Sequence, residues 1–128
     1  EHYQAILKVT PNHADALNDL AWIYQQLKDP RALDTAEAAL RAAPTSPVVM
    51  DTLAVILQQQ GDKRRSLELL QKAAAARPSD VEISAHLALA FHANGRRSEA
   101  LAIISRLEKS GSPFLKRAEF KEIARQVK

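Results

Sequence analysis

Apolar residues recur along this chain at the spacing of amphipathic helices, and the helices recur with a longer period. Pro11, Pro44 and Pro78 each close a helical stretch, and they stand 33 and then 34 residues apart. Self-similarity at a fixed period of about 20 to 50 residues is typical of solenoids, in which each unit packs on its neighbours. The pattern therefore predicts an all-α, right-handed solenoid built from antiparallel helix pairs.

The units align residue by residue when they are shifted by one period. The first helix of each unit shares a leucine, an alanine and a large apolar residue: Leu20, Leu53 and Leu87; Ala21, Ala54 and Ala88; Tyr24, Leu57 and Phe91. The second helix shares a small residue, a leucine and a later position: Ala32, Ser66 and Ala100; Leu33, Leu67 and Leu101; Ala39, Ala73 and Leu107. We expect these positions to form the core between helices.

Turn and cap residues mark the ends of the predicted helices. Ser46 and Asp80 are good N-caps, Pro47 suits a first helical position, and Gly61 and Gly95 suit left-handed helix ends. The first unit has no such glycine and uses Asp29-Pro30 to begin its second helix. The predicted helices span residues 1–9, 14–27, 30–42, 47–60, 63–76, 81–94 and 97–109.

The final segment breaks the register and predicts a capping element. Ser112-Pro113 begins a helix through FLKRAEFKEIARQVK, with Phe120, Ile123, Ala124 and Val127 on one face. We read residues 1–128 as one domain. It comprises the second helix of a truncated repeat (1–11), three repeats (12–44, 45–78 and 79–111) and a capping helix (112–128). We expect further repeats upstream in a longer protein, and a natural end of the array at the C-terminus.

Composition excludes several function classes. The 18 basic and 15 acidic residues leave a net charge of only +3, far from the signature of a nucleic-acid-binding protein, so no nucleic acid is expected as a partner. The chain contains no cysteine, and no apolar run approaches the ~20 residues of a membrane span. We predict neither a thiolate metal site nor a membrane-spanning segment.

No residue pattern predicts catalysis. His86 and His92 are six residues apart and face different directions on a helix, whereas paired metal ligands on a helix stand about three or four apart. We read them as bystanders or at most single polar contacts. There is no glycine-rich phosphate loop and no nucleophile elbow. We predict no enzyme activity, no catalytic or metal-binding residue and no cofactor.

The aligned residues resemble the tetratricopeptide repeat. The resemblance rests on Leu-Ala and a large apolar residue in the first helix, small residues in the second and a closing proline. The last repeat departs from the pattern, because Leu107 replaces a small residue and no proline closes it. The stretches ALNDLAWIYQQLKDPRALDTAEAA and DTLAVILQQQGD also resemble repeat lipoproteins of bacterial exopolysaccharide and PEP-CTERM protein-sorting systems. That narrower resemblance implies a periplasmic or outer-membrane-associated protein; the chain itself indicates no compartment.

The resemblance implies that the first helices line a concave groove that binds a protein or peptide. Trp22, Val55 and Leu89 then form an apolar stripe. One turn further along lies an amide row of Gln25 and Gln58 with His92, and with Gln26 and Gln59 beside them. Toward the start of the same helices, Asp15, Asn18, Asp51 and Glu82 form an acidic entrance. The predicted groove residues are Asn18, Trp22, Gln25, Asp51, Val55, Gln58, Leu89 and His92. Two other readings stay open here: Trp22 belongs to the core, and the glutamines are solvated helix positions. The carboxylate clamp of some repeat proteins does not fit, because acidic and apolar residues occupy its places.

Basic residues gather at the turns between helices. Arg31, Lys63, Arg64, Arg65, Arg96 and Arg97 would form an edge able to bind an anionic polysaccharide, lipid headgroups or nucleic acid. The plain alternative is that they are solvated turn residues that balance nearby carboxylates. A third reading of the whole chain is structural: a spacer or self-associating unit whose groove is empty or filled by a neighbouring copy.

Overall fold

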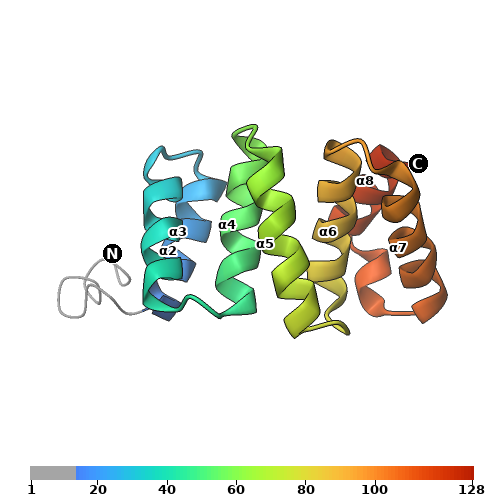
Figure 1. The fold of residues 1–128 in the computed structure, drawn as a ribbon, viewed down its shortest axis with the longest axis horizontal. Helices are drawn as coiled ribbons and strands as arrows, with labels where there is room; N and C mark the ends of the chain where they lie inside the picture. The colour runs from blue at the N-terminus through green and yellow to red at the C-terminus, as the bar shows by residue number, and fades with distance from the viewer. Residues whose placement is uncertain (1–13) are drawn as a thin grey trace.

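The computed structural model describes residues 14–128 as a row of paired helices (Figure 1). Within that range it contains α-helices and one 3-10 turn and no strand. The elements are α2 (Ala14–Gln26), α3 (Arg31–Ala42), α4 (Pro47–Gln59), α5 (Lys63–Ala76), α6 (Val81–Ala93), α7 (Arg97–Ser110), η1 (Pro113–Lys116) and α8 (Ala118–Val127). The predicted helix at 1–9, the truncated repeat at 1–11 and the start of the first full repeat lie outside the described residues.

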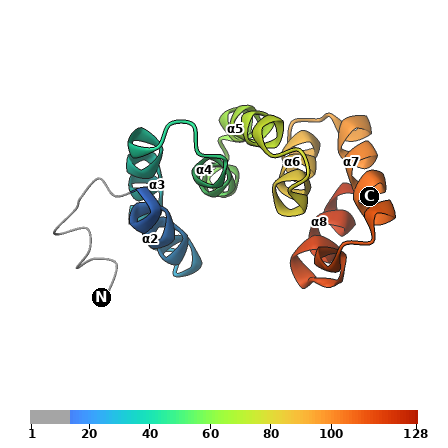
Figure 2. The ribbon, with the colours of Figure 1, turned by 90° about the horizontal axis from the view of Figure 1, so that it is seen from below.

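Successive helices pair and stack as the repeat predicts. The closest packing joins α2 with α3, α4 with α5 and α6 with α7, and each pair also packs on the next. Viewed from below, α4 is set back between α2 at one end of the row and α8 at the other (Figure 2). The all-α solenoid of helix pairs is confirmed. The exact boundaries between repeats stay a prediction.

Small residues occupy the contacts between helices. Ala21, Ala54 and Ala88 are completely buried, as is Ser66 in the second helix of its pair. The Ser66 hydroxyl donates a hydrogen bond of 2.8 Å to the carbonyl of Ala54, so this buried polar group is satisfied across the α4–α5 contact. Small side chains let the helix axes approach, and the leucines of the pattern fill the space beside them.

The predicted caps are present. Ser46 and Asp80 each accept a hydrogen bond from the backbone N–H three residues on, and Pro47 begins α4. The first unit has no glycine at the end of its first helix, and the turn there differs from the prediction. Lys28 takes the left-handed conformation with φ 57°. The second helix begins at Arg31 rather than at residue 30, and its N–H donates to the Asp29 carboxylate at 2.9 Å.

The C-terminal segment is not the single helix that the sequence predicted. Pro113–Lys116 forms a 3-10 turn, and Arg117 is extended (ψ 145°) before α8 begins. The break allows the rings of Phe114 and Phe120 to pack edge to face, 5.9 Å apart, with both side chains buried. A straight helix would point these two residues in different directions. The predicted apolar face of Phe120, Ile123 and Val127 is buried.

Candidate binding groove

A pocket lies in the concave side of the array, between α4, α6 and α8, and α5 forms its floor. Its volume is about 210 Å³, below the ~300 Å³ at which pockets for small-molecule ligands usually begin. Its size suits a side chain or two of a bound polypeptide. The lining residues are Ala54, Val55, Gln58, Gln59, Ser66, Leu70, His86, Leu89, Glu119, Glu122, Ile123 and Gln126.

Part of the predicted groove lines this pocket. Val55, Gln58 and Leu89 contribute to its wall. The α2 residues Asn18, Trp22 and Gln25 lie on the neighbouring inner helix and do not line it, and neither does His92 on α6. Asp51 on α4 does not line the pocket, but it contacts His86, which does.

The α8 side of the pocket is absent from the sequence prediction. Glu119, Glu122, Ile123 and Gln126 stand on α8 at spacings of three, four and seven from the first, so they share one helix face. That spacing was the available signal. The surface they face was not predictable locally, because it depends on α8 packing more on α6 than on α7.

The apolar stripe is partly exposed, in contrast with its buried neighbours. Trp22, Val55 and Leu89 are each half-buried, whereas the alanine before each of them is completely buried. Trp22 is therefore more exposed than Ala21, the core residue beside it, but it is not fully exposed. Half-buried apolar side chains in equivalent places on successive inner helices are available for contact with a ligand.

The predicted amide row is only partly satisfied within the protein. The Gln25 side-chain amide donates a hydrogen bond to the side-chain oxygen Oε1 of Gln59 and thereby links α2 and α4. Two side-chain oxygens, Asn18 Oδ1 and Gln58 Oε1, are buried without a hydrogen-bond partner, the only such side-chain atoms in residues 14–128. A buried acceptor without a donor is unfavourable, and a bound donor would relieve that cost.

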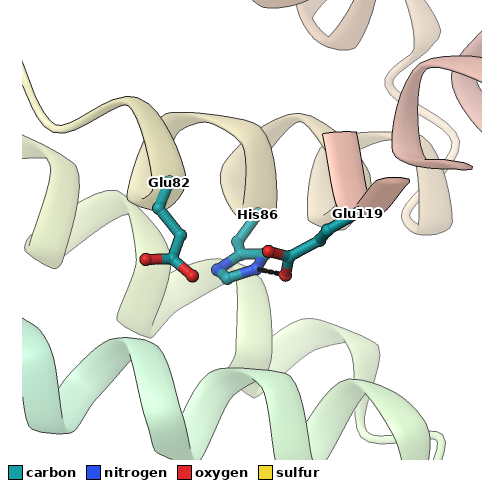
Figure 3. Close-up of side chains that lie close together, drawn as sticks. All are labelled: Glu82, His86 and Glu119. Carbon is teal, nitrogen blue, oxygen red and sulfur yellow. Dashed lines mark hydrogen bonds and ion pairs between the residues drawn. The ribbon is translucent and has the colours of Figure 1, made fainter. Parts of the chain in front are cut away.

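His86 is not the bystander that its spacing from His92 suggested. Its side chain is 5% exposed and bridges two helices: Nδ1 contacts Asp51 of α4 at 2.8 Å, and Nε2 contacts Glu119 of α8 at 2.7 Å. The prediction was wrong because both partners are more than thirty residues away in sequence. Figure 3 shows Glu82 and Glu119 on opposite sides of the imidazole ring.

The surroundings of His86 hold it in the charged form. Burial alone would lower its pKa, but the hydrogen bonds and negative charges of Asp51 and Glu119 outweigh burial and raise it to about 10. The hydrogen bond from His86 lowers the pKa of Glu119. Burial raises the pKa of Glu82, the positive charges of His86 and Arg117 oppose that increase, and Glu119 and Asp51 add to it.

Glu82, His86 and Glu119 are also the residue types that bind a divalent metal ion. Their candidate ligand atoms lie within 4.8 Å of one another. A metal ion would need a neutral imidazole, whereas the raised pKa keeps His86 protonated at neutral pH. A metal ion would therefore have to displace the proton of His86 before it could bind these three side chains.

The predicted basic edge is largely paired within the chain. Arg31 pairs with Asp29, Arg64 with Glu68, Arg65 with Glu37 and Arg96 with Glu99, and Arg97 donates to the backbone carbonyl of Lys128. The guanidinium groups of Arg31 and Arg96 also lie over the Tyr24 and Phe91 rings, 4.3 and 4.8 Å from the ring centres. Lys63 is exposed. These contacts favour the reading of solvated turn residues that balance carboxylates.

None of the helices in residues 14–128 has the length and apolar character of a membrane span.

Comparison with known proteins identifies the repeat. Two family models, both described as tetratricopeptide repeat, match residues 2–33 and 52–113. No curated protein is detectably similar in sequence.

Solved structures share the fold at low sequence identity. The crystal structure of MamA is 18% identical over 98% of this chain and 82% of its own, with a TM-score of 0.76. PilF of Pseudomonas aeruginosa is 19% identical over 98% of this chain and 62% of its own, with a TM-score of 0.76. TTC0263, a thermophilic repeat protein of Thermus thermophilus, is 20% identical over 98% of this chain and 69% of its own, with a TM-score of 0.73. Identities this low show a common fold and nothing more specific.

Proposed function

The chain is a tetratricopeptide-repeat protein, and on that premise we propose that it is a non-catalytic scaffold whose concave groove binds a segment of a partner protein. Proteins of this fold are generally interaction scaffolds. The observation that supports the proposal is the pocket between α4, α6 and α8, with Val55 and Leu89 half-exposed in its wall. Water-facing helices have no intrinsic need for such residues in register, whereas a bound segment would bury them.

The pocket also offers polar groups suited to a polypeptide. Gln58, Gln59 and Gln126 surround its apolar wall. Each amide side chain has donors and an acceptor, so it can pair with the backbone of an extended segment. An apolar centre with a polar rim is the usual organisation of a protein-binding surface.

The cellular setting is a separate proposal with less support. A role in the cell envelope, in exopolysaccharide export or PEP-CTERM sorting, rests on the sequence resemblance alone, and the comparisons add nothing to it. A lipobox or secretion signal in the complete reading frame would support this setting, and a complete frame without either would count against it.

Two alternative functions, binding of an anionic polysaccharide and self-association, can be tested by experiment. Direct binding of an anionic polysaccharide is less favoured, because the arginines of the basic edge already have partners within the chain. Self-association through the groove would appear as a concentration-dependent mass in sedimentation and would be abolished by the same groove substitutions as partner binding.

A random-peptide display selection on the immobilised chain tests the scaffold function. We expect enriched peptides whose binding is weakened by Leu89→Asn, which removes apolar surface from the pocket without adding charge. Leu101→Asn is the matched control, because Leu101 is equally half-buried but stands on the outer helix α7. Thermal melts establish that both variants fold. Failure to enrich any peptide, or binding that Leu89→Asn leaves unchanged while Leu101→Asn weakens it, would overturn the proposal.

A further inference from the structure

The charged residues of the described chain are distributed unevenly between its inner and outer helices. The inner helices α2, α4 and α6 contain no lysine or arginine, although they carry Asp15, Asp19, Asp51 and Glu82. Every lysine and arginine in residues 14–128 stands on α3, α5, α7, α8, η1 or a turn. Three of the helices along the groove therefore carry acidic side chains without any permanent cation, whereas α8, which forms the remaining wall of the pocket, carries Lys121 and Arg125, and Arg125 pairs with Glu122.

We propose that the segment bound in this groove is cationic, with lysine or arginine side chains that enter the acidic end of the pocket beside apolar side chains held by Val55 and Leu89. The inference rests on the proposed scaffold function and specifies the chemistry of its partner.

The acidic cluster at one end of the pocket, of which only His86 and Glu119 line the pocket itself, retains negative charge even when His86 is protonated. Three carboxylates, those of Asp51, Glu82 and Glu119, surround this one imidazole. Asp51 and Glu119 are both in contact with the ring, whereas Glu82 faces it without a direct ion pair. Glu122 adds a further carboxylate to the pocket wall, although Arg125 pairs with it. His86 and the nearby guanidinium of Arg117 supply two positive charges against the three carboxylates, so a cation from the ligand would complete the cluster.

The unpartnered acceptors point in the same direction independently of charge. Gln58 Oε1 belongs to a pocket residue and lacks a donor, and Asn18 Oδ1 lacks one on the neighbouring inner helix. Lysine and arginine side chains carry only hydrogen-bond donors, while carboxylates carry only acceptors. The side chains of a cationic segment would offer donors to these oxygens in addition to its backbone N–H groups, whereas an acidic segment has only its backbone donors and would be repelled by Glu82 and Glu119.

The peptides enriched by the display selection provide the probe. We expect lysine and arginine to be more frequent in them than in the unselected library. Resynthesised peptides with each arginine replaced by citrulline and each lysine by norleucine should bind the full chain about tenfold more weakly, because they lose charge but keep shape. Binding of the unmodified peptides should weaken as salt concentration rises.

A charge variant of the protein tests whether the acidic cluster is the part of the groove that binds the basic side chains of the peptides. Glu82→Gln should weaken the basic peptides several-fold and leave the citrulline and norleucine versions unchanged. Glu68→Gln on the outer helix α5 is the matched control and should weaken neither. Enriched peptides without excess lysine or arginine, or equal binding after neutral replacement, would overturn the cationic partner. If Leu89→Asn still weakens those peptides, the scaffold function survives. If no peptide is enriched at all, both proposals fail together.

Discussion

His86 connects three helices through one side chain. From α6 it contacts Asp51 on α4 and Glu119 on α8, and its ring is almost completely buried. A buried ion pair rarely adds much stability compared with apolar packing, but removal of one partner leaves the other charges uncompensated. At the scale of single residues, His86 is therefore the position where the groove and the C-terminal helix depend most on each other.

His86→Gln should destabilise the protein in a pH-dependent way. The folded-state pKa of about 10 exceeds the ordinary 6.5, so the folded protein binds this proton more tightly. The stabilisation is then complete below pH 6.5 and is lost as pH rises through 10. At pH 6.5 we expect the substitution to lower the free energy of unfolding by about 3 kcal/mol. That value is at the lower limit of what breaking a buried ion pair usually costs.

Urea unfolding of both proteins at pH 6.5 and at pH 10 measures this difference, and the titrating groups that do not interact with His86 cancel because the two chains share them. The difference in free energy of unfolding between wild type and variant should become smaller as pH rises. A difference that is the same at both values would show that His86 is neutral in the folded protein.

Trp22 should contact the bound segment where that segment crosses α2. It is half-buried, stands outside the pocket and is the only tryptophan. Trp22→Ala should weaken peptide binding by ~2 kcal/mol, the usual scale for an interface anchor, and leave folding close to intact. Intrinsic fluorescence gives the measurement: emission should shift to the blue when an enriched peptide binds. Emission that is already blue and protected from quenchers, together with marked destabilisation of the variant, would place Trp22 in the core.

At the scale of elements, α8 both caps the array and forms one wall of the pocket. Its apolar face closes the open end of the last helix pair, as solenoids require of their terminal element. The neighbouring face presents Glu119, Glu122 and Gln126 to the pocket. One helix thus links the stability of the C-terminal repeat to the shape of the groove.

Phe120→Ala should destabilise the protein by ~3 kcal/mol, because the ring is 4% exposed and packs on Phe114. Lys121→Ala, at an exposed neighbouring position, is the control and should have little effect. Thermal denaturation followed by circular dichroism compares them. Equal melting temperatures for Phe120→Ala and wild type would mean that α8 is not a packed cap.

Elements determined by contacts between residues near in sequence could be predicted, whereas elements determined by contacts between distant residues could not. Ser46, Asp80, Gly61 and Gly95 act on backbone groups within a few residues, so the sequence pattern located these caps and helix ends well. The break at Arg117 depends on Phe114 reaching Phe120, and local periodicity did not reveal it. The link from His86 to Glu119 spans 33 residues and depends on where α8 packs, so the pocket's acidic wall was missed.

At the scale of the whole molecule, the solenoid separates two kinds of surface. The inner helices α2, α4 and α6 carry acidic and apolar side chains but no lysine or arginine, whereas the turns, the outer helices and α8 carry the basic side chains together with further carboxylates. The net charge of +3 conceals this separation, because it averages over both faces. A long-range field of this kind selects partners by charge before contact is made.

The paired basic edge leads us to expect weak binding of polyanions. Dextran sulfate at low ionic strength should bind the chain poorly, because Arg64, Arg65 and Arg96 have carboxylate partners. Charge reversal at Arg64, Arg65, Arg96 and Arg97 should therefore change retention on a dextran sulfate column little. Strong, salt-sensitive retention of the wild type that the reversal abolishes would assign polymer binding to this edge.

The binding surface itself can be mapped with an enriched peptide, and this measurement bears most closely on the concave groove. Backbone amide chemical shifts of the labelled chain, recorded with and without the peptide, report contact residue by residue. We predict changes concentrated on α4, α6 and α8 around Val55, Gln58 and Leu89, extending to Trp22 on α2, with the outer helices α3, α5 and α7 little affected. Changes concentrated on the outer helices and turns, with Val55 and Leu89 unperturbed, would contradict the concave groove as the binding surface.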